Sequence, residues 1–103
     1  MSEQIESEAF VRRHMIESLD YYVNMFNSSK KPWSRRVEAV KFPEGIRVVN
    51  HIIGRNVAFV VISGMGCVVK IDDSDIVKEL KFDTFYDGIM NIVEYFFSDK
   101  LVR

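Results

Sequence analysis

The sequence predicts an α+β domain: a long N-terminal helix, a four-stranded antiparallel β-meander, a short helix and a C-terminal helix packed on the sheet. Three observations predict this class. Apolar residues recur at helical spacing over residues 2–27, four Val- and Ile-rich segments lie within residues 37–71, and a second helical pattern covers residues 84–97. A chain of 103 residues fits a single domain, residues 1–103, with one core.

The N-terminal segment, residues 2–27, is expected to be one continuous helix with two apolar stripes. The wider stripe should face the core and contains Ile5, Ala9, Val11, Met15, Ile16, Leu19, Tyr22, Val23 and Phe26. The narrower stripe contains Phe10, His14, Tyr21 and Met25, beside Glu3, Glu6 and Glu17. Because two stripes usually mean two neighbours, we interpret the narrower one as an interface with a partner subunit. Scattered surface aromatics are the alternative.

Residues 37–42, 46–53, 57–63 and 67–71 are the four expected strands. The turns between them are too short to hold crossover helices, so neighbouring strands should be antiparallel. The third strand is apolar on both faces, which indicates that something covers its second face. That cover is either a pair of helices placed on opposite faces of the sheet or a second copy of the sheet in a dimer.

An acidic segment follows the strands, and residues 74–80 are expected to form the short helix. Asp72, Asp73 and Asp75 suit its N-terminus, and this explains them with fewer assumptions than a bound cation. The final helix should cover residues 84–97, capped by Asp83 or Thr84. Gly88 lies inside that helix despite its poor helix propensity, which predicts close packing there.

A basic loop surrounds the only tryptophan of the chain. Residues 28–56 hold seven Lys or Arg against two acids, a net charge of +5, whereas the whole chain carries −1. Such a cluster suits phosphate contacts with a stacked base, and equally suits a solvated loop that neutralises the acidic helices. The residues of this alternative nucleic-acid site are Lys30, Lys31, Trp33, Arg35, Arg36, Arg47 and Arg55.

No catalytic, cofactor or metal motif emerges from the sequence. His14, His51 and Cys67 lie on separate elements and satisfy no metal-ligand spacing. Cys67 has apolar neighbours and is expected to be a buried, unreactive thiol. His51 should alternate with Arg47 on one strand, so a small-molecule pocket between helix and sheet near His51 is a third, weaker hypothesis.

The sequence therefore favours a non-catalytic interaction module that forms a homodimer or binds a protein partner through apolar helix or sheet surface. Nucleic-acid binding is the alternative. The first eight residues hold three glutamates and no apolar segment, and no apolar run approaches the roughly 18 residues of a membrane helix. We expect a cytoplasmic protein with no cofactor and no membrane partner.

Overall fold

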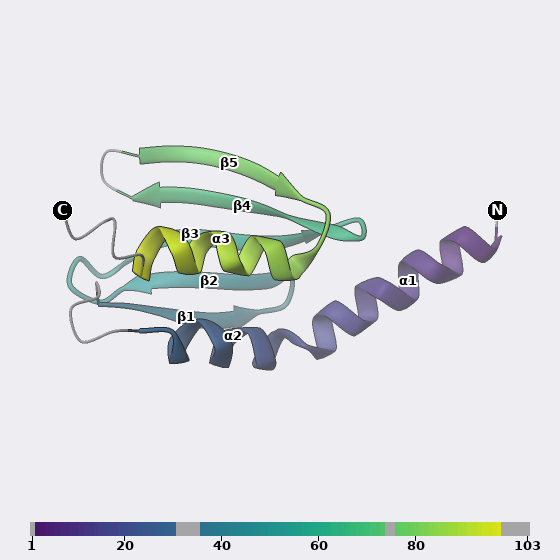
Figure 1. Ribbon diagram of the computed structural model, residues 1–103, viewed down its shortest axis with the longest axis horizontal. Coiled ribbons are helices and arrows are strands. Elements are labelled where there is room, and N and C mark those ends of the chain that lie inside the picture. The colour runs from purple at the N-terminus through teal and green to yellow at the C-terminus, as the bar shows by residue number, and fades with distance from the viewer. Residues whose placement is uncertain (1, 31–35, 74–75, 98–103) are drawn as a thin grey trace.

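The described part of the chain forms a five-stranded antiparallel sheet and three helices (Figure 1). The computed structural model describes residues 2–30, 36–73 and 76–97, with side chains from Ala9 onward. The helices are α1 (Ser2–Glu17), α2 (Leu19–Ser28) and α3 (Phe85–Phe97), and the strands are β1 (Val37–Phe42), β2 (Gly45–Asn50), β3 (Arg55–Ser63), β4 (Gly66–Asp73) and β5 (Ile76–Phe82). The predicted α+β class and the antiparallel sheet are confirmed.

Each strand pairs with the next one along the chain, in the order β1-β2-β3-β4-β5. Gly54 and Gly64 form the β2–β3 and β3–β4 turns with φ of 65° and 60°, a conformation that favours glycine. Strand β2 ends at Asn50 rather than at residue 53, because the Gly54 amide donates to the Asn50 carbonyl over 2.9 Å and closes the turn. His51, predicted inside a strand, therefore lies in this turn.

The short helix predicted over residues 74–80 is wrong, because strand β5 begins at Ile76. Strand β5 runs antiparallel to β4, from the Asp73–Ile76 pair to the Cys67–Phe82 pair. The acidic residues resembled a helix N-terminus, but the outer backbone groups of β4 need hydrogen-bond partners, and the β-branched side chains of Ile76 and Val77 suit a strand. The sheet consequently has a fifth strand at the edge where a helix was expected.

The single helix predicted over residues 2–27 is instead two helices that meet at Ser18. Ser18 has φ −93° and ψ 1°, which departs from regular helix geometry. Backbone hydrogen bonds nevertheless continue through the junction: the Ser18 amide donates to the His14 carbonyl over 3.0 Å, and the Tyr22 amide donates to the Ser18 carbonyl over 3.1 Å. The direction in which α1 leaves the domain is therefore set by α2.

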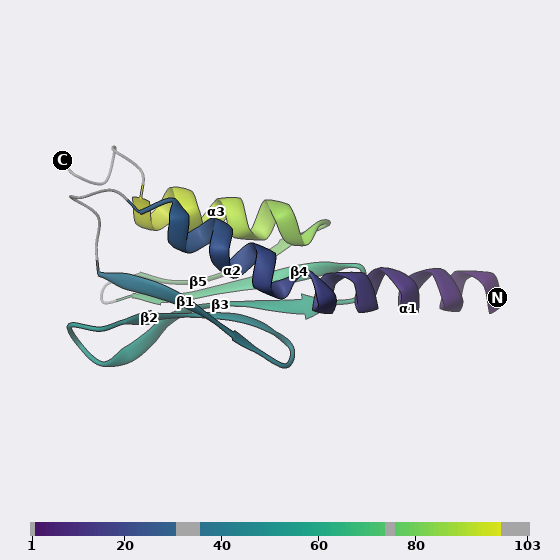
Figure 2. The same ribbon diagram turned by 90° about the horizontal axis from the view of Figure 1, so that it is seen from below.

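Helices α2 and α3 lie on the same face of the sheet (Figure 2). Helix α2 packs on β1 and β2, and α3 packs on β3, β4 and β5. Between the helices, the ring of Phe26 lies 4.8 Å from that of Phe97 and 6.2 Å from that of Phe96, centroid to centroid. The core is the layer between this helix pair and the sheet, so the predicted alternative with helices on opposite faces is wrong.

Specific contacts fix both helices on the sheet. The Asn27 side chain spans from α2 to β1: its Nδ2 donates to the Ala39 carbonyl over 3.2 Å, and its Oδ1 accepts from the Ala39 amide over 2.9 Å. On α3, the Thr84 hydroxyl accepts the Asp87 amide over 3.1 Å, which confirms the predicted cap. Gly88 lies directly above Cys67, where a β-carbon would overlap the sulfur, so the predicted close packing is confirmed.

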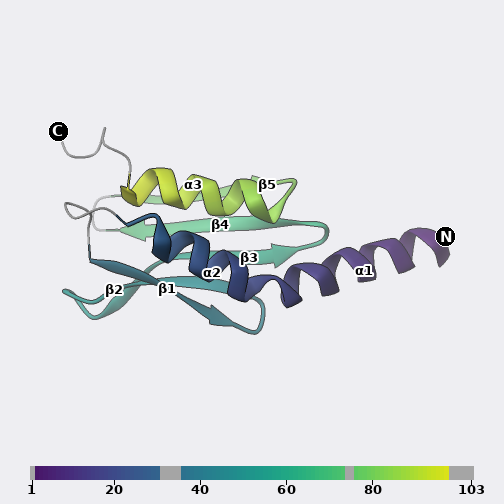
Figure 3. The same cartoon turned by 60° about the horizontal axis from the view of Figure 1, so that its bottom comes forward.

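Helix α1 extends past the end of the sheet (Figure 3), and the molecule measures 50 × 24 × 24 Å. Among the described α1 side chains only Met15 is buried, with Val11 packed partly against the core. Ala9 is exposed and Ile16 is 44% exposed, so the prediction that they face the core is wrong. The cause is that only the last turns of α1, around Val11 and Met15, reach the core, while the rest of the helix extends beyond the sheet.

Candidate functional site

The face of the sheet opposite α2 and α3, here called the open face, has an apolar centre. Strand register places six side chains there from four strands: Val40, Phe42, Val49, Phe59, Val61 and Val68. All six are partly buried by one another, and the rings of Phe42 and Phe59 meet edge to face at 6.3 Å. No helix of the described chain packs on this face (Figure 2).

One cation lies within this apolar centre. Arg47 of β2 is directly between Val40 of β1 and Phe59 of β3 in the strand register. Its side chain is partly buried, and its guanidinium donates to Asn56 Oδ1 over 3.1 Å. Because a guanidinium has five N–H donors, this bond leaves most of its hydrogen-bonding capacity for a carboxylate or carbonyl from a partner.

The margins of the open face are charged. His51 Nε2 lies 2.9 Å from Glu38 Oε1, and Lys70 Nζ lies 4.0 Å from Glu79 Oε1. These side chains are about half exposed, so each pair contributes at most about 1 kcal/mol to stability. An apolar centre inside a polar margin is the usual pattern of a protein-binding surface.

The four predicted interface residues lie on two helices. Phe10 and His14 are exposed on α1, and the Phe10 side chain is 69% exposed. On α2, Tyr21 is 64% exposed with its ring edge on Tyr22 at 5.4 Å, while Met25 packs partly against the core. The structure therefore leaves Phe10, His14 and Tyr21 accessible to a partner.

Tyr22, beside Tyr21, is partly buried. Burial raises the pKa of the Tyr22 hydroxyl, and the nearby hydroxyls of Tyr21 and Tyr86 raise it further.

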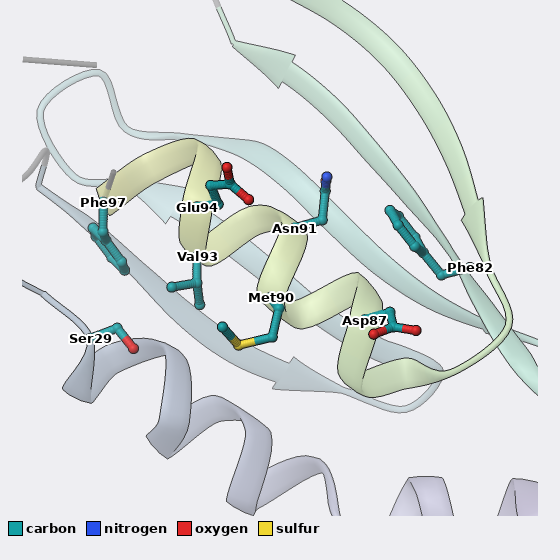
Figure 4. A pocket seen from close by; sticks show the side chains of 8 residues that line it. All are labelled: Ser29, Phe82, Asp87, Met90, Asn91, Val93, Glu94 and Phe97. Atoms are coloured by element: carbon teal, nitrogen blue, oxygen red, sulfur yellow. The ribbon is translucent and has the colours of Figure 1, made fainter. Parts of the chain in front are cut away.

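A shallow groove of about 790 Å³ follows the outer side of α3 (Figure 4). Its lining consists of Ser29, Phe82, Asp87, Met90, Asn91, Val93, Glu94 and Phe97. Asn91 Oδ1 is buried there without a hydrogen-bond partner among the described residues. The groove offers two carboxylates, an amide and a hydroxyl, but no histidine or thiol that could act as a nucleophile or general base at neutral pH.

The predicted nucleic-acid residues are only partly described. Lys31, Trp33 and Arg35 lie outside the described residues, while Lys30 and Arg36 are exposed on either side of them. The remaining two are on the sheet, where Arg47 bonds Asn56 and Arg55 Nη1 lies 3.9 Å from Asp72 Oδ2. Arg36 and Arg55 lie at the same end of the sheet, beside the turn that contains His51.

The described residues contain no arrangement that suggests catalysis. Cys67 is buried, burial raises the pKa of its thiol to about 11, and its sulfur lies 3.6 Å from the Thr84 carbonyl oxygen as a weak donor. His51 is exposed and bonded to Glu38, and the groove on α3 lies across the sheet from it. No three His, Cys, Asp or Glu residues of the described chain come together as metal ligands.

Comparison with known proteins adds no family to this picture: no protein-family model matches the chain, and no curated protein or solved structure matches it. None of the helices in the described ranges has the length and apolarity needed to cross a bilayer. The two apolar faces of β3 are predictable from the sequence, whereas its apolar neighbours on the open face are not. On that face β1 contributes Val40 and Phe42, but β2 and β4 contribute only one valine each, Val49 and Val68, among polar residues.

Proposed function

We propose that this protein is a non-catalytic interaction module that self-associates, and that the open face is its docking surface. The single observation that carries the proposal is the second face of β3. Phe59 and Val61 lie there with apolar neighbours from three other strands, while α2 and α3 both pack on the opposite face. Of the two predicted covers for this face, helices on opposite faces are excluded by the positions of α2 and α3, and the other was a second copy of the sheet in a dimer; we propose that the cover comes from a second copy of the chain.

The physical basis is the burial of apolar surface. Full burial of a Val or Phe side chain contributes about 1.5–3 kcal/mol. The six apolar side chains of the open face are already partly buried, so docking would gain roughly 1 kcal/mol from each. Six such gains sum to about 6 kcal/mol per copy, which offsets a large part of the entropy lost on association.

Sedimentation velocity or multi-angle light scattering at micromolar concentration tests the proposal. We expect a dimer for the wild-type chain, and a monomer for Phe59→Glu, because that substitution puts a carboxylate at the apolar centre. Val77→Glu is the matched control: Val77 is 78% exposed on the margin of the same face, and its substitution should leave the dimer intact. A wild-type monomer, or an unchanged dimer in Phe59→Glu, would contradict the proposal.

Nucleic-acid binding through the basic loop remains the alternative proposal. It is supported by the exposed side chains of Lys30 and Arg36, which flank the Trp33 segment. It has less support than self-association, because Lys31, Trp33 and Arg35, the centre of the basic loop, lie outside the described residues.

A further inference from the structure

Most of the described side chains of α1, from Ala9 to Glu17, are exposed. Phe10 is 69% and Ile16 is 44% exposed, and α1 contacts the remainder of the described chain chiefly through α2. Most helical stability in proteins comes from packing of an apolar face rather than from helix propensity. A second protein surface would therefore stabilise the exposed, 16-residue α1.

The open face of the same chain cannot be that surface. Helix α2 lies on the other side of the sheet, and backbone hydrogen bonds at Ser18 hold α1 as a continuation of α2 (Figure 2). To reach its own open face, α1 would have to break these bonds and turn around the β1 edge. The open face of another molecule is accessible to it without breaking these bonds.

Charge distinguishes α1 from a second sheet as the occupant of the open face. Two open faces brought together would place the cations of both copies, Arg47 and Lys70, in one interface. On α1 instead, Glu17 follows Phe10 by seven residues and so lies on the same side of the helix. A carboxylate beside an aromatic side chain complements an apolar surface that carries an arginine.

Dimensions agree with this arrangement. At 1.5 Å per residue α1 is about 24 Å long, and strands of six to nine residues are about 20–30 Å long. A helix about 10 Å wide would cover about 240 Å² of the sheet, and about the same area of the helix surface would be buried. Two such contacts bury about 960 Å² in all, which is close to the lower limit of about 1,000 Å² for a biological interface.

We propose that two copies exchange their α1 helices, so that the α1 of each copy lies across the open face of the other with Phe10 against the apolar centre. The arrangement has two-fold symmetry, and the helix of each copy supplies the layer that its partner's sheet lacks. This inference rests on the proposed function, because it names the element that occupies the open face.

Disulfide trapping between two variants that each carry one added cysteine tests the exchange. A tagged Phe10→Cys chain is mixed with an untagged Val61→Cys chain under mild oxidation, and we expect a mixed disulfide dimer. Tyr86→Cys mixed with Val61→Cys is the matched control, because Tyr86 is 49% exposed on α3, on the opposite side of the sheet. The wild-type chain controls for Cys67, which is buried.

The outcomes separate the exchange from self-association in general. Disulfide dimers of Val61→Cys alone, without the mixed product, would mean that two sheets face each other; the exchange would then be wrong and the proposed function would stand. A monomer in solution would overturn both. Arg47→Ala gives an independent readout: it should weaken an exchanged dimer by about tenfold, whereas it should strengthen a sheet-to-sheet dimer by removing like charges.

Discussion

Gly88→Ala tests how closely α3 approaches the sheet. A β-carbon at this position would overlap Cys67 Sγ and would lie 3.3 Å from Val69 Cγ2 and 3.4 Å from Val60 Cγ1. Two effects of opposite sign compete. Alanine favours the helix by about 1 kcal/mol relative to glycine, whereas forcing an extra carbon into a packed core costs about 1–3 kcal/mol.

The overlap of the new β-carbon with Cys67 Sγ decides whether Gly88→Ala raises or lowers the free energy of unfolding. The two β3 and β4 methyl groups need to move by only a few tenths of an ångström, but the Cys67 sulfur must leave its place under α3 and its contact with the Thr84 carbonyl. We expect Gly88→Ala to lower the free energy of unfolding by roughly 1–2 kcal/mol, or about 5–10 °C in melting temperature. Urea denaturation followed by circular dichroism measures this as a lower midpoint at unchanged slope.

A double-mutant cycle with Cys67→Ala identifies the cause. Removal of the sulfur should open the space that the new methyl group needs, so Gly88→Ala should be neutral or stabilising in that background. The reasoning would be refuted by a single Gly88→Ala variant that is about 1 kcal/mol more stable than wild type. That result would mean that helix propensity dominates and that α3 is not in close contact with β4.

Three further predictions concern the α2 contact, the thiol and the basic loop. Asn27→Ala should lower the free energy of unfolding, measured by urea denaturation, by about 1–3 kcal/mol, because it leaves the amide and the carbonyl of Ala39 without their partner. The control Asn24→Ala, at an exposed position of the same helix, should leave this free energy almost unchanged. Burial raises the pKa of the Cys67 thiol from 9.0 to about 11, so the folded state binds this proton more tightly than the unfolded state does. The resulting contribution to stability is complete below pH 9.0 and is lost as the pH rises through about 11. Across that pH window the free energy of unfolding should fall by up to about 3 kcal/mol in the wild-type chain and by less in Cys67→Ala. An equal fall in both proteins would refute the assignment of this pH dependence to Cys67. If the alternative function holds, affinity for short DNA or RNA should drop steeply with salt and Lys30→Ala with Lys31→Ala should lower that slope by about 2; absence of binding at low salt removes the hypothesis.

The hairpins were predictable from sequence because their signals are local. Val- and Ile-rich segments separated by Gly54 and Gly64 specify antiparallel neighbours without knowledge of the remaining chain. Strand β5 was not predictable in this way. Its acidic approach resembles a helix N-terminus, and only the unpaired edge of β4, which the sequence does not display, favours a strand there.

The candidate site was predictable only in part for a similar reason. The two apolar faces of β3 are visible in the residues Val57 to Ile62, and so is the second stripe around Phe10. Which face a helix covers depends on the direction in which the chain leaves α2 and enters α3. Neither periodicity nor composition encodes that direction, so both helices could be detected while their shared face could not.

The order of the strands also has a consequence for how the domain folds. All four strand pairings join segments adjacent in sequence, and such contacts form quickly because the loops they close are short. The contact of Phe26 with Phe96 and Phe97 instead joins helices at opposite ends of the chain. We expect this aromatic contact to form last and open first, which amide hydrogen exchange would show as earlier loss of protection in α2 and α3 than in β3 and β4. The sheet then acts as the folding nucleus, and the pairing of the two helices closes the domain.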